Sequence, residues 1–163
     1  FYMALRKPHL ITADGLARIE KELAYLTGVK REQVAERLNR AMDDGQDDDF
    51  VDNAELEAAR HEQSFLEGRI LELQDIMRFH QIIQEDETPH DNVKIGDWIT
   101  VVEDGSDEEE RYHLVGAAEA DPAEGRISNE SPLGIALLGS KIGDVVSVNA
   151  PNGVIKFKVV NFE

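Results

Sequence analysis

An acidic segment near the middle of the chain reads Asp43-Asp44-Gly45-Gln46-Asp47-Asp48-Asp49-Phe50-Val51-Asp52. Six of its ten residues are aspartates, and none is Lys or Arg. Carboxylates this close together repel one another, and burial would strip water from every charge. The segment therefore predicts an exposed turn. If the sequences on its two sides form antiparallel helices, this turn lies at the far end of a hairpin.

Apolar residues on the N-terminal side of this turn recur at helical spacing. We expect one long helix from about Thr12, as its N-cap, to Met42. Its apolar stripe consists of Leu16, Ile19, Leu23, Leu26, Val34, Leu38 and Ala41. The stripe shifts by one position near Gly28, where a local kink or loosening is expected because glycine weakens a helix.

The C-terminal side carries a second stripe, with unbroken spacings of three and four residues. It consists of Leu56, Ala59, Gln63, Leu66, Ile70, Leu73 and Met77. This is coiled-coil spacing, although packing in an ordinary helical bundle would also explain it. Since only two long helices are predicted, a two-stranded antiparallel coiled coil is the simplest way to cover both stripes. At about 1.5 Å per residue, helices of roughly 25–30 residues make a hairpin on the order of 40 Å long.

Beyond the helices the pattern changes to short β-branched and aromatic runs, which predict strands. The runs occupy residues 98–102, 111–115, 145–148 and 154–160. Asn152-Gly153 predicts a tight turn with positive φ angles, and a short helix is expected to start at Pro132 and stop at Gly139. The fold class is therefore α+β, with a helical hairpin followed by a compact α+β domain.

A polar segment that contains Pro89 separates the two patterns and predicts a linker. We place the hairpin at residues 3–83, the linker at 84–92 and the second domain at 93–163.

The composition limits the possible partners and chemistry. The net charge is −17, with 17 Lys+Arg against 34 Asp+Glu, which disfavours a general nucleic-acid or anionic membrane surface because phosphate binding needs clustered cations. The chain has no cysteine, so disulfides and thiolate zinc sites are excluded. Its five histidines are scattered and no nucleophile–base arrangement is present, so an enzyme is not expected. With no long apolar run, we expect a cytoplasmic protein that does not bind membranes.

Several segments resemble signatures of the bacterial Gre transcription elongation factors. Residues 49–60, which read DFVDNAELEAAR, are similar to the hairpin-tip signature, in which two acids precede Asn-Ala-Glu and then Ala-Ala-Arg. Residues 127–139, which read ISNESPLGIALLG, are similar to the C-terminal signature together with Gly143-Asp144. Leu10-Ile11-Thr12 resembles the start of the family's sequence. The resemblance covers nearly the whole chain in the right order.

The resemblance implies an FKBP-like C-terminal domain that docks on RNA polymerase, and a coiled coil that enters the polymerase's secondary channel. It implies that Asp49 and Asp52 help to hold a Mg²⁺ shared with the polymerase, which then cleaves the 3′ end of a backtracked transcript. Carboxylate oxygens are ligands that suit Mg²⁺. The chain would be a non-enzymatic cofactor, a monomer when free, with no cofactor of its own and only indirect contact with the RNA 3′ end. Phe50 takes the apolar tip position.

By the same resemblance, Ser128, Glu130 and Pro132 fall where Gre factors contact the polymerase. Arg40 and Arg60 lie near positions where the family carries a basic patch that faces RNA. For each arginine the alternative is a solvated ion pair with a nearby carboxylate.

The tip also departs from the family pattern, because it is longer and its extra residues are acidic. Asp52 stands where Glu is customary, and a misplacement of about 1 Å can cost roughly a hundredfold in rate. One alternative is a Gre-like factor that binds the channel and inhibits the polymerase. The four surplus aspartates would then chelate the metal unproductively or repel nucleic acid, or they have no effect: Asp43, Asp44, Asp47 and Asp48.

A further alternative is a stand-alone metal site formed by the aspartates. Residues 47–52 lack the alternating ligands and the central glycine of an EF-hand calcium loop, which disfavours that interpretation.

Overall fold

The computed structural model describes residues 6–44, 54–84 and 88–163. The chain divides into two compact units: one is Leu16–Phe79, and the other combines the residues up to Gly15 with His80–Glu163. The domain boundaries predicted from the sequence, with the hairpin ending at residue 83 and the second domain beginning at residue 93, stay predictions. Among the described helices, none has the length and apolar character to cross a membrane.

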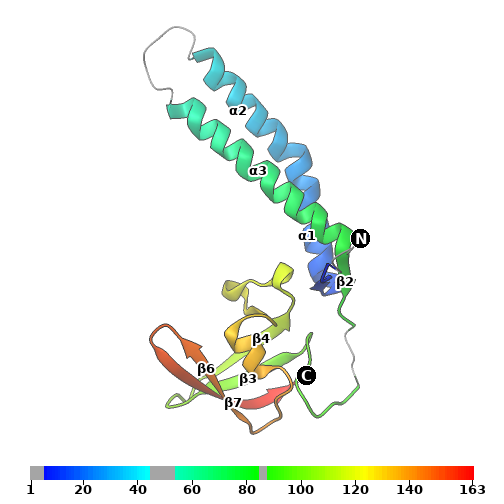
Figure 1. Ribbon diagram of the computed structural model, residues 1–163, viewed down its shortest axis with the longest axis vertical. Coiled ribbons are helices and arrows are strands. Elements are labelled where there is room, and N and C mark those ends of the chain that lie inside the picture. Colours follow the sequence, from blue (N-terminus) through cyan, green and yellow to red (C-terminus); the bar gives the residue numbers. More distant parts are fainter. Residues whose placement is uncertain (1–5, 45–53, 85–87) are drawn as a thin grey trace, which may run out of the picture. The chain divides into compact units, whose positions relative to one another are not determined.

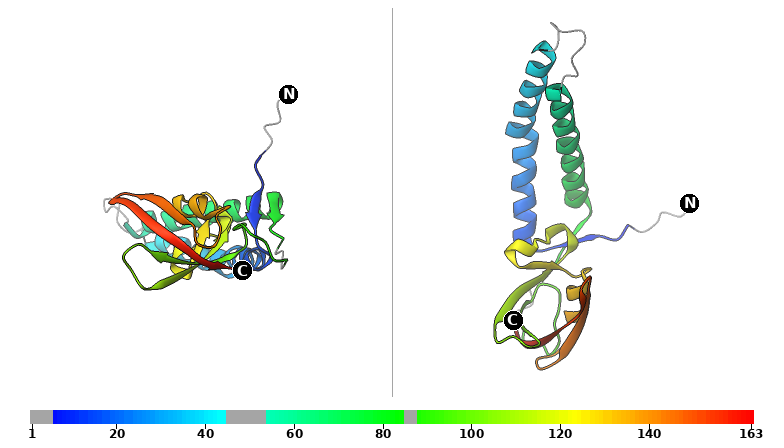
Figure 2. Two further views of the ribbon diagram at one scale, coloured as in Figure 1. Left: turned by 90° about the horizontal axis from the view of Figure 1, so that it is seen from below. Right: turned by 90° about the vertical axis from the view of Figure 1, so that its left-hand side faces the viewer.

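The unit Leu16–Phe79 is a hairpin of long helices (Figures 1 and 2). Its first arm consists of α1 (Ala13–Tyr25), the π-helical segment η1 (Leu26–Lys30) and α2 (Arg31–Asp44). The second arm is α3 (Ala54–Phe79). Ion pairs join Glu22 to Arg69 and Arg37 to Glu55, so the residue numbers run in opposite directions along the two arms. The predicted antiparallel hairpin is confirmed.

The irregularity expected near Gly28 is the π-helical segment η1. The backbone N–H of Arg31 bonds to the carbonyl oxygen of Leu26, five residues earlier, and to that of Gly28. A π turn contains one residue more than an α turn. This extra residue accounts for the one-position shift of the apolar stripe. Val34, on the far side of the shift, is consequently buried against Leu66 in the core of the hairpin.

The stripe of α3 is buried largely as predicted. The buried side chains of this helix are Ala59, Leu66, Ile70, Leu73 and Ile76. Gln63 was expected on the stripe but is exposed, so this part of the prediction is wrong. Its amide keeps its contact with water, because a buried amide needs hydrogen-bond partners that an apolar core does not offer. Near the end of the helix, Ile76 is buried and Met77 is only half-buried.

Carboxylates of α3 pair with cations of the opposite arm. Glu62 accepts hydrogen bonds from Lys30 Nζ and Arg37 Nη1, each at 2.6 Å. Arg31 binds Glu67 through two nitrogens, at 3.0 and 2.9 Å. The hydrogen bonds from these cations hold the pKa of Glu62 and Glu67 below the ordinary glutamate value, and those from Arg37 do the same for Glu55.

Acid is therefore expected to weaken the hairpin. A carboxyl whose pKa is lower in the folded state stabilises the fold above its unfolded pKa, and this contribution is lost as pH falls through the folded pKa. The Tm of the hairpin should thus decrease when the pH is lowered below 4.5, the ordinary pKa of glutamate. This decrease should be less steep in the Arg37→Gln variant. Melts followed by circular dichroism at pH values from neutral to acidic measure both, with Arg60→Gln as control. Identical pH profiles for wild type and Arg37→Gln would contradict the assignment.

The second unit contains a five-stranded sheet of order β5-β4-β3-β7-β6 (Figure 1). The strands are β3 (Trp98–Glu103), β4 (Glu109–Val115), β5 (Arg126–Ser128), β6 (Val145–Ala150) and β7 (Gly153–Phe162). Strands β4 and β5 are parallel, and the other neighbours are antiparallel. The four predicted strands and the α+β fold class are confirmed, whereas β5 was not predicted.

The core of this unit lies on one side of the sheet, where α4 (Pro132–Leu137) contributes Leu137. The other buried members are Val93, Ile99, Val101, Leu114, Ile127, Val148, Phe157 and Val159. Helix α4 starts at Pro132 as predicted, and Gly139 follows its end with a φ of +80°. Two 3₁₀ segments, η3 (Ala117–Glu119) and η4 (Pro122–Glu124), connect β4 to β5.

The turn between β6 and β7 differs from the prediction. Ala150 pairs with Gly153, so Pro151 and Asn152 form the loop. Gly153 has a φ of +130°, while no described residue other than glycine has a positive φ. The positive φ expected at Asn152 is therefore wrong. Pro151 fixes a negative φ at the first loop position, and the glycine after the loop supplies the unusual backbone conformation.

A short parallel pair of strands joins two distant segments, which was not predicted. β1 (His9–Ile11) pairs with β2 (His80–Ile82). Directly after β1, Thr12 caps α1, since its Oγ1 accepts a hydrogen bond from Gly15 N at 3.0 Å, and the predicted N-cap is confirmed. The buried carboxylate of Glu119 accepts from Thr12 N at 2.9 Å. Gly15 leaves room for that carboxylate, because a Cβ there would lie 2.3 Å from Glu119 Cδ.

The described end of the expected linker, residues 88–92, makes side-chain contacts. His90 Nε2 lies 2.7 Å from Asp97 Oδ2, and its ring stacks on Phe162 with centroids 5.4 Å apart. The hydrogen bond with Asp97 raises the pKa of His90 above its ordinary value. Val93, which follows, is buried in the core.

Candidate functional site

The expected tip residues Asp49, Phe50 and Asp52 fall in residues 45–53, outside the described part of the chain. The structure describes the two helix ends that this segment joins. Helix α2 ends at Asp44 and α3 begins at Ala54. Among the described residues, which do not include the acidic tip, no group of three or more potential metal ligands occurs. The roles expected for the tip residues stay predictions.

The described end of the hairpin has a small cavity of about 330 Å³. It is lined by Arg37, Arg40, Ala41, Asp44 and Glu55. Within it the guanidinium of Arg37 binds Glu55, with Nε 2.7 Å from Oε1. Arg40 has no ion pair with any described side chain, although its charge helps to lower the pKa of Glu55 after the larger effect of Arg37.

The two arginines expected to face RNA therefore differ. Arg60 lies on α3 and pairs with Glu57, one turn away, at 3.6 Å. This is the solvated ion pair considered as the alternative, and such exposed pairs are weak. Arg40 lies in the last turns of α2 and has no such pair with the side chains that the structure describes.

The three expected docking residues lie in one tight turn between β5 and α4. Ser128 is the last residue of β5, and its Oγ accepts a hydrogen bond from Glu130 N at 3.0 Å. The carbonyl oxygen of Ser128 accepts from Ser131 Oγ at 2.7 Å. Pro132 is the first residue of α4 and is exposed. The structure thus brings Ser128, Glu130 and Pro132 together on a short segment fixed by its own hydrogen bonds.

The first turn of α4 holds this segment in place. Ser131 caps the helix, and its Oγ accepts from Gly134 N at 3.1 Å. Gly134 is buried directly against the segment, because a Cβ there would lie 2.0 Å from the carbonyl oxygen of Ser128. Glycine is therefore required at this position, and the closeness of the two backbones fixes where Glu130 is displayed.

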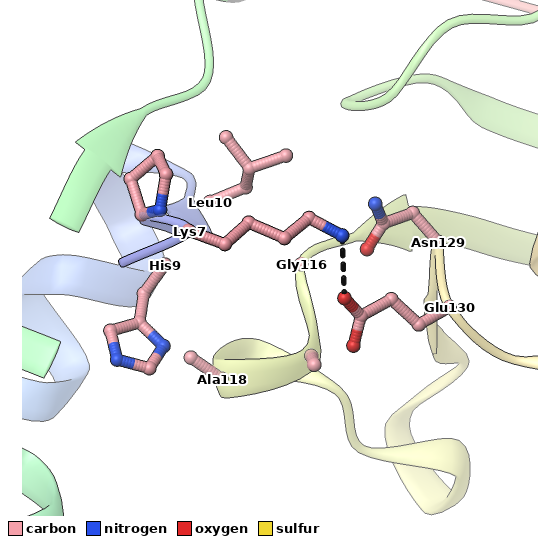
Figure 3. Close-up of a pocket in the computed structure, with 9 residues that line it drawn as sticks. Lys7, His9, Leu10, Gly116, Ala118, Asn129 and Glu130 are labelled. Atoms are coloured by element: carbon pink, nitrogen blue, oxygen red, sulfur yellow. Dashed lines mark hydrogen bonds and ion pairs between the residues drawn. The ribbon is translucent and has the colours of Figure 1, made fainter. Parts of the chain in front are cut away.

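Glu130 has a partner that was not anticipated from the sequence. Lys7, just before β1, places Nζ 3.1 Å from Glu130 Oε1 (Figure 3). Both side chains are largely exposed, at 77% and 54%, so the pair contributes little to stability. Nothing in the local sequence connects residues 123 positions apart; the contact depends on the packing of the segment around Leu10 against Gly116.

Comparison with protein-family models gives two matches. One, described as "Transcription elongation factor, N-terminal", matches residues 9–82. The other, described as "Transcription elongation factor, GreA/GreB, C-term", matches residues 88–163. Between them the two matches include the hairpin, the five-stranded sheet and the turn that carries Glu130.

Curated relatives match over nearly the whole length. The transcription elongation factor GreA of Acetivibrio thermocellus is 44% identical over 158 residues, which cover 97% of this chain and 98% of that protein. GreA of Thermoanaerobacter pseudethanolicus is 44% identical over 156 residues, covering 96% and 98%. Among solved structures, GreA factor homolog 1 (Gfh1) of Thermus thermophilus is 29% identical, with a TM-score of 0.43 and coverage of 96% and 99%.

Proposed function

The chain belongs to the GreA/GreB family of transcription elongation factors, and we propose that it binds a bacterial RNA polymerase and stimulates cleavage of backtracked transcripts. In this proposal the hairpin enters the secondary channel, and the polymerase performs the Mg²⁺-dependent cleavage. The chain acts in the cytoplasm as a non-enzymatic cofactor. The observation that supports the proposal is the acidic motif Asp49-Phe50-Val51-Asp52, which in the sequence ends two residues before the start of α3 at Ala54.

Docking is assigned to the turn that begins at Ser128. Its internal hydrogen bonds fix the backbone, so the backbone that carries Glu130 and Pro132 needs little further ordering on binding. Glu130 offers a carboxylate to a cation of the polymerase, and Pro132 offers a rigid apolar surface. The exposed pair with Lys7 is easily broken, so it does not prevent Glu130 from exchanging partners.

Catalytic support is assigned to Asp49 and Asp52, which would hold a Mg²⁺ jointly with the polymerase. The donor set fits, since Mg²⁺ usually takes one or two protein carboxylates beside phosphates and waters. When bound, the ion would polarise the phosphate and help to generate the attacking nucleophile. The chain itself contributes two anionic oxygen ligands three residues apart, and Arg40, which has no ion pair with the described side chains, would offer its charge to an RNA phosphate.

A purified transcription complex that is stalled and backtracked tests the proposal. Adding the protein is expected to shorten the RNA from its 3′ end faster than the polymerase does alone, and only when Mg²⁺ is present. The readout is the length of 5′-labelled RNA over time. Binding without shortening, together with slower synthesis, would instead support the inhibitory alternative, which the four surplus aspartates of the tip favour.

A further inference from the structure

A pocket of about 280 Å³ lies beside the docking turn, within the unit that contains the sheet (Figure 3). It is lined by Lys7, Pro8, His9, Leu10, Gly116, Ala117, Ala118, Asn129 and Glu130. Leu10, Gly116 and Ala118 give it apolar or uncharged walls. The carboxylate of Glu130 and the side-chain amide of Asn129 stand at one end, where both offer oxygen acceptors.

The segments that form the pocket are held rigidly. Gly116 approaches the backbone of β1 so closely that a Cβ would lie 1.7 Å from the carbonyl oxygen of Leu10. On the other side, Asn129 N donates to Val115 O at 2.8 Å, which ties the docking turn to β4. The pocket is thus a feature of the packed backbone and does not depend on side-chain positions alone.

Lys7 shows what kind of group fits this pocket. Its aliphatic stem runs across the space towards the turn, and its ammonium reaches the carboxylate of Glu130 at 3.1 Å (Figure 3). The side chain is nevertheless 77% exposed, so it crosses the mouth of the pocket without filling it. A cationic group on a flexible stem is therefore compatible with the site, and room remains for a second one.

We propose that this pocket receives one arginine side chain of the polymerase when the docking turn binds. The inference rests on the proposed function and names a contact within the same docking surface. The stem of the arginine would cover Leu10 and Ala118, and its guanidinium would replace Lys7 at Glu130. Arginine suits the site better than lysine, because its planar fork can bind a carboxylate and a neighbouring amide oxygen at once. The net charge of −17 favours a cationic partner over a second copy of this chain.

Filling the pocket from within tests this inference. Ala118→Leu is expected to weaken binding to purified core polymerase by about tenfold, the loss expected when one desolvated charge-assisted contact is excluded. Ala123→Leu is the control, since Ala123 also lies in a 3₁₀ segment of the same unit but is exposed and does not line the pocket, whereas Ala118 is half-buried at its wall. Equal affinities for the two variants, with unchanged Tm, would overturn the inference.

A second variant changes Lys7, which competes with the incoming arginine for Glu130, and leaves the pocket walls unchanged. Lys7→Met keeps most of the aliphatic stem but removes the charge that occupies Glu130, so an incoming arginine no longer has to displace it. Binding is expected to tighten severalfold, an effect that an apolar occupant would not produce. Unchanged or weaker binding of Lys7→Met would contradict an arginine in the pocket, even if Ala118→Leu failed to fold. If the wild-type protein did not bind polymerase, the proposed function itself would be overturned. If the wild type bound and both variants bound with the same affinity, only this inference would be overturned.

Discussion

Asp49→Asn is expected to abolish stimulated transcript cleavage while leaving polymerase binding unchanged. Asparagine keeps the size of the side chain but removes the negative charge that suits a divalent cation. Loss of one group that stabilises charge in a transition state typically lowers a rate by on the order of 10²–10³. The measurement is the rate of RNA shortening at saturating protein, with affinity determined separately by competition against labelled wild type. Asp52→Asn is expected to behave alike.

Two further substitutions make this test specific for the motif. Asp47→Asn removes an equal charge from the same segment but lies outside the assigned pair, so cleavage should persist. Asp52→Glu restores the side-chain length customary in the family and should retain or raise the rate. If Asp47→Asn lost as much activity as Asp49→Asn, the assignment of the metal to Asp49 and Asp52 would be wrong.

Gly134→Ala is expected to destabilise the C-terminal unit severely and to disrupt docking. The added Cβ would lie 2.0 Å from the carbonyl oxygen of Ser128 and 2.9 Å from its carbonyl carbon, so backbone has to move. Forced overpacking of this kind costs about 1–3 kcal/mol, and more where the obstacle is rigid. The chain has a single tryptophan, Trp98 in β3, whose fluorescence reports unfolding of this unit in urea. Its transition should move to lower urea concentration.

The same substitution at Gly68 provides a control of opposite sign. Gly68 lies within α3, and a Cβ there would meet nothing within 4 Å. Replacing glycine by alanine in an open helical position stabilises a helix by roughly 1 kcal/mol. In urea, the Gly68→Ala variant should therefore lose its helical circular dichroism signal at a higher urea concentration than wild type. The unfolding transition reported by Trp98 fluorescence should stay unchanged. A Gly134→Ala variant as stable as wild type would refute the close packing of α4 on the docking turn.

The hairpin was predictable because helical periodicity is a local signal. Leu66, Ile70 and Leu73 repeat at the spacing of one helix face, and that face is buried. The π-helical segment was also indicated by the sequence, as the one-position shift of the apolar stripe near Gly28. Gln63 was misassigned because periodicity marks a position on a helix but not whether a polar side chain there turns to water.

Contacts between distant segments could not be predicted in the same way. β1 and β2 contain three residues each, too few for an alternating pattern, and their pairing joins His9 to His80. Lys7 and Glu119 acquire their partners because the N-terminal segment also packs against the chain around Gly116. The docking turn was found by its sequence signature, whereas the pocket beside it arises from three segments that no local motif connects.

The π segment also sets a rule for how the hairpin tolerates changes in length. Each residue removed from a continuous α-helix rotates everything beyond it by about 100° around the helix axis. A deletion within α2 would therefore rotate the part of the helix beyond it and turn its apolar residues away from α3. Deleting one residue of Leu26–Lys30 would instead convert the π turn to an α turn and restore a regular heptad from Leu16 to Ala41. The apolar face of α2 would then stay turned towards α3.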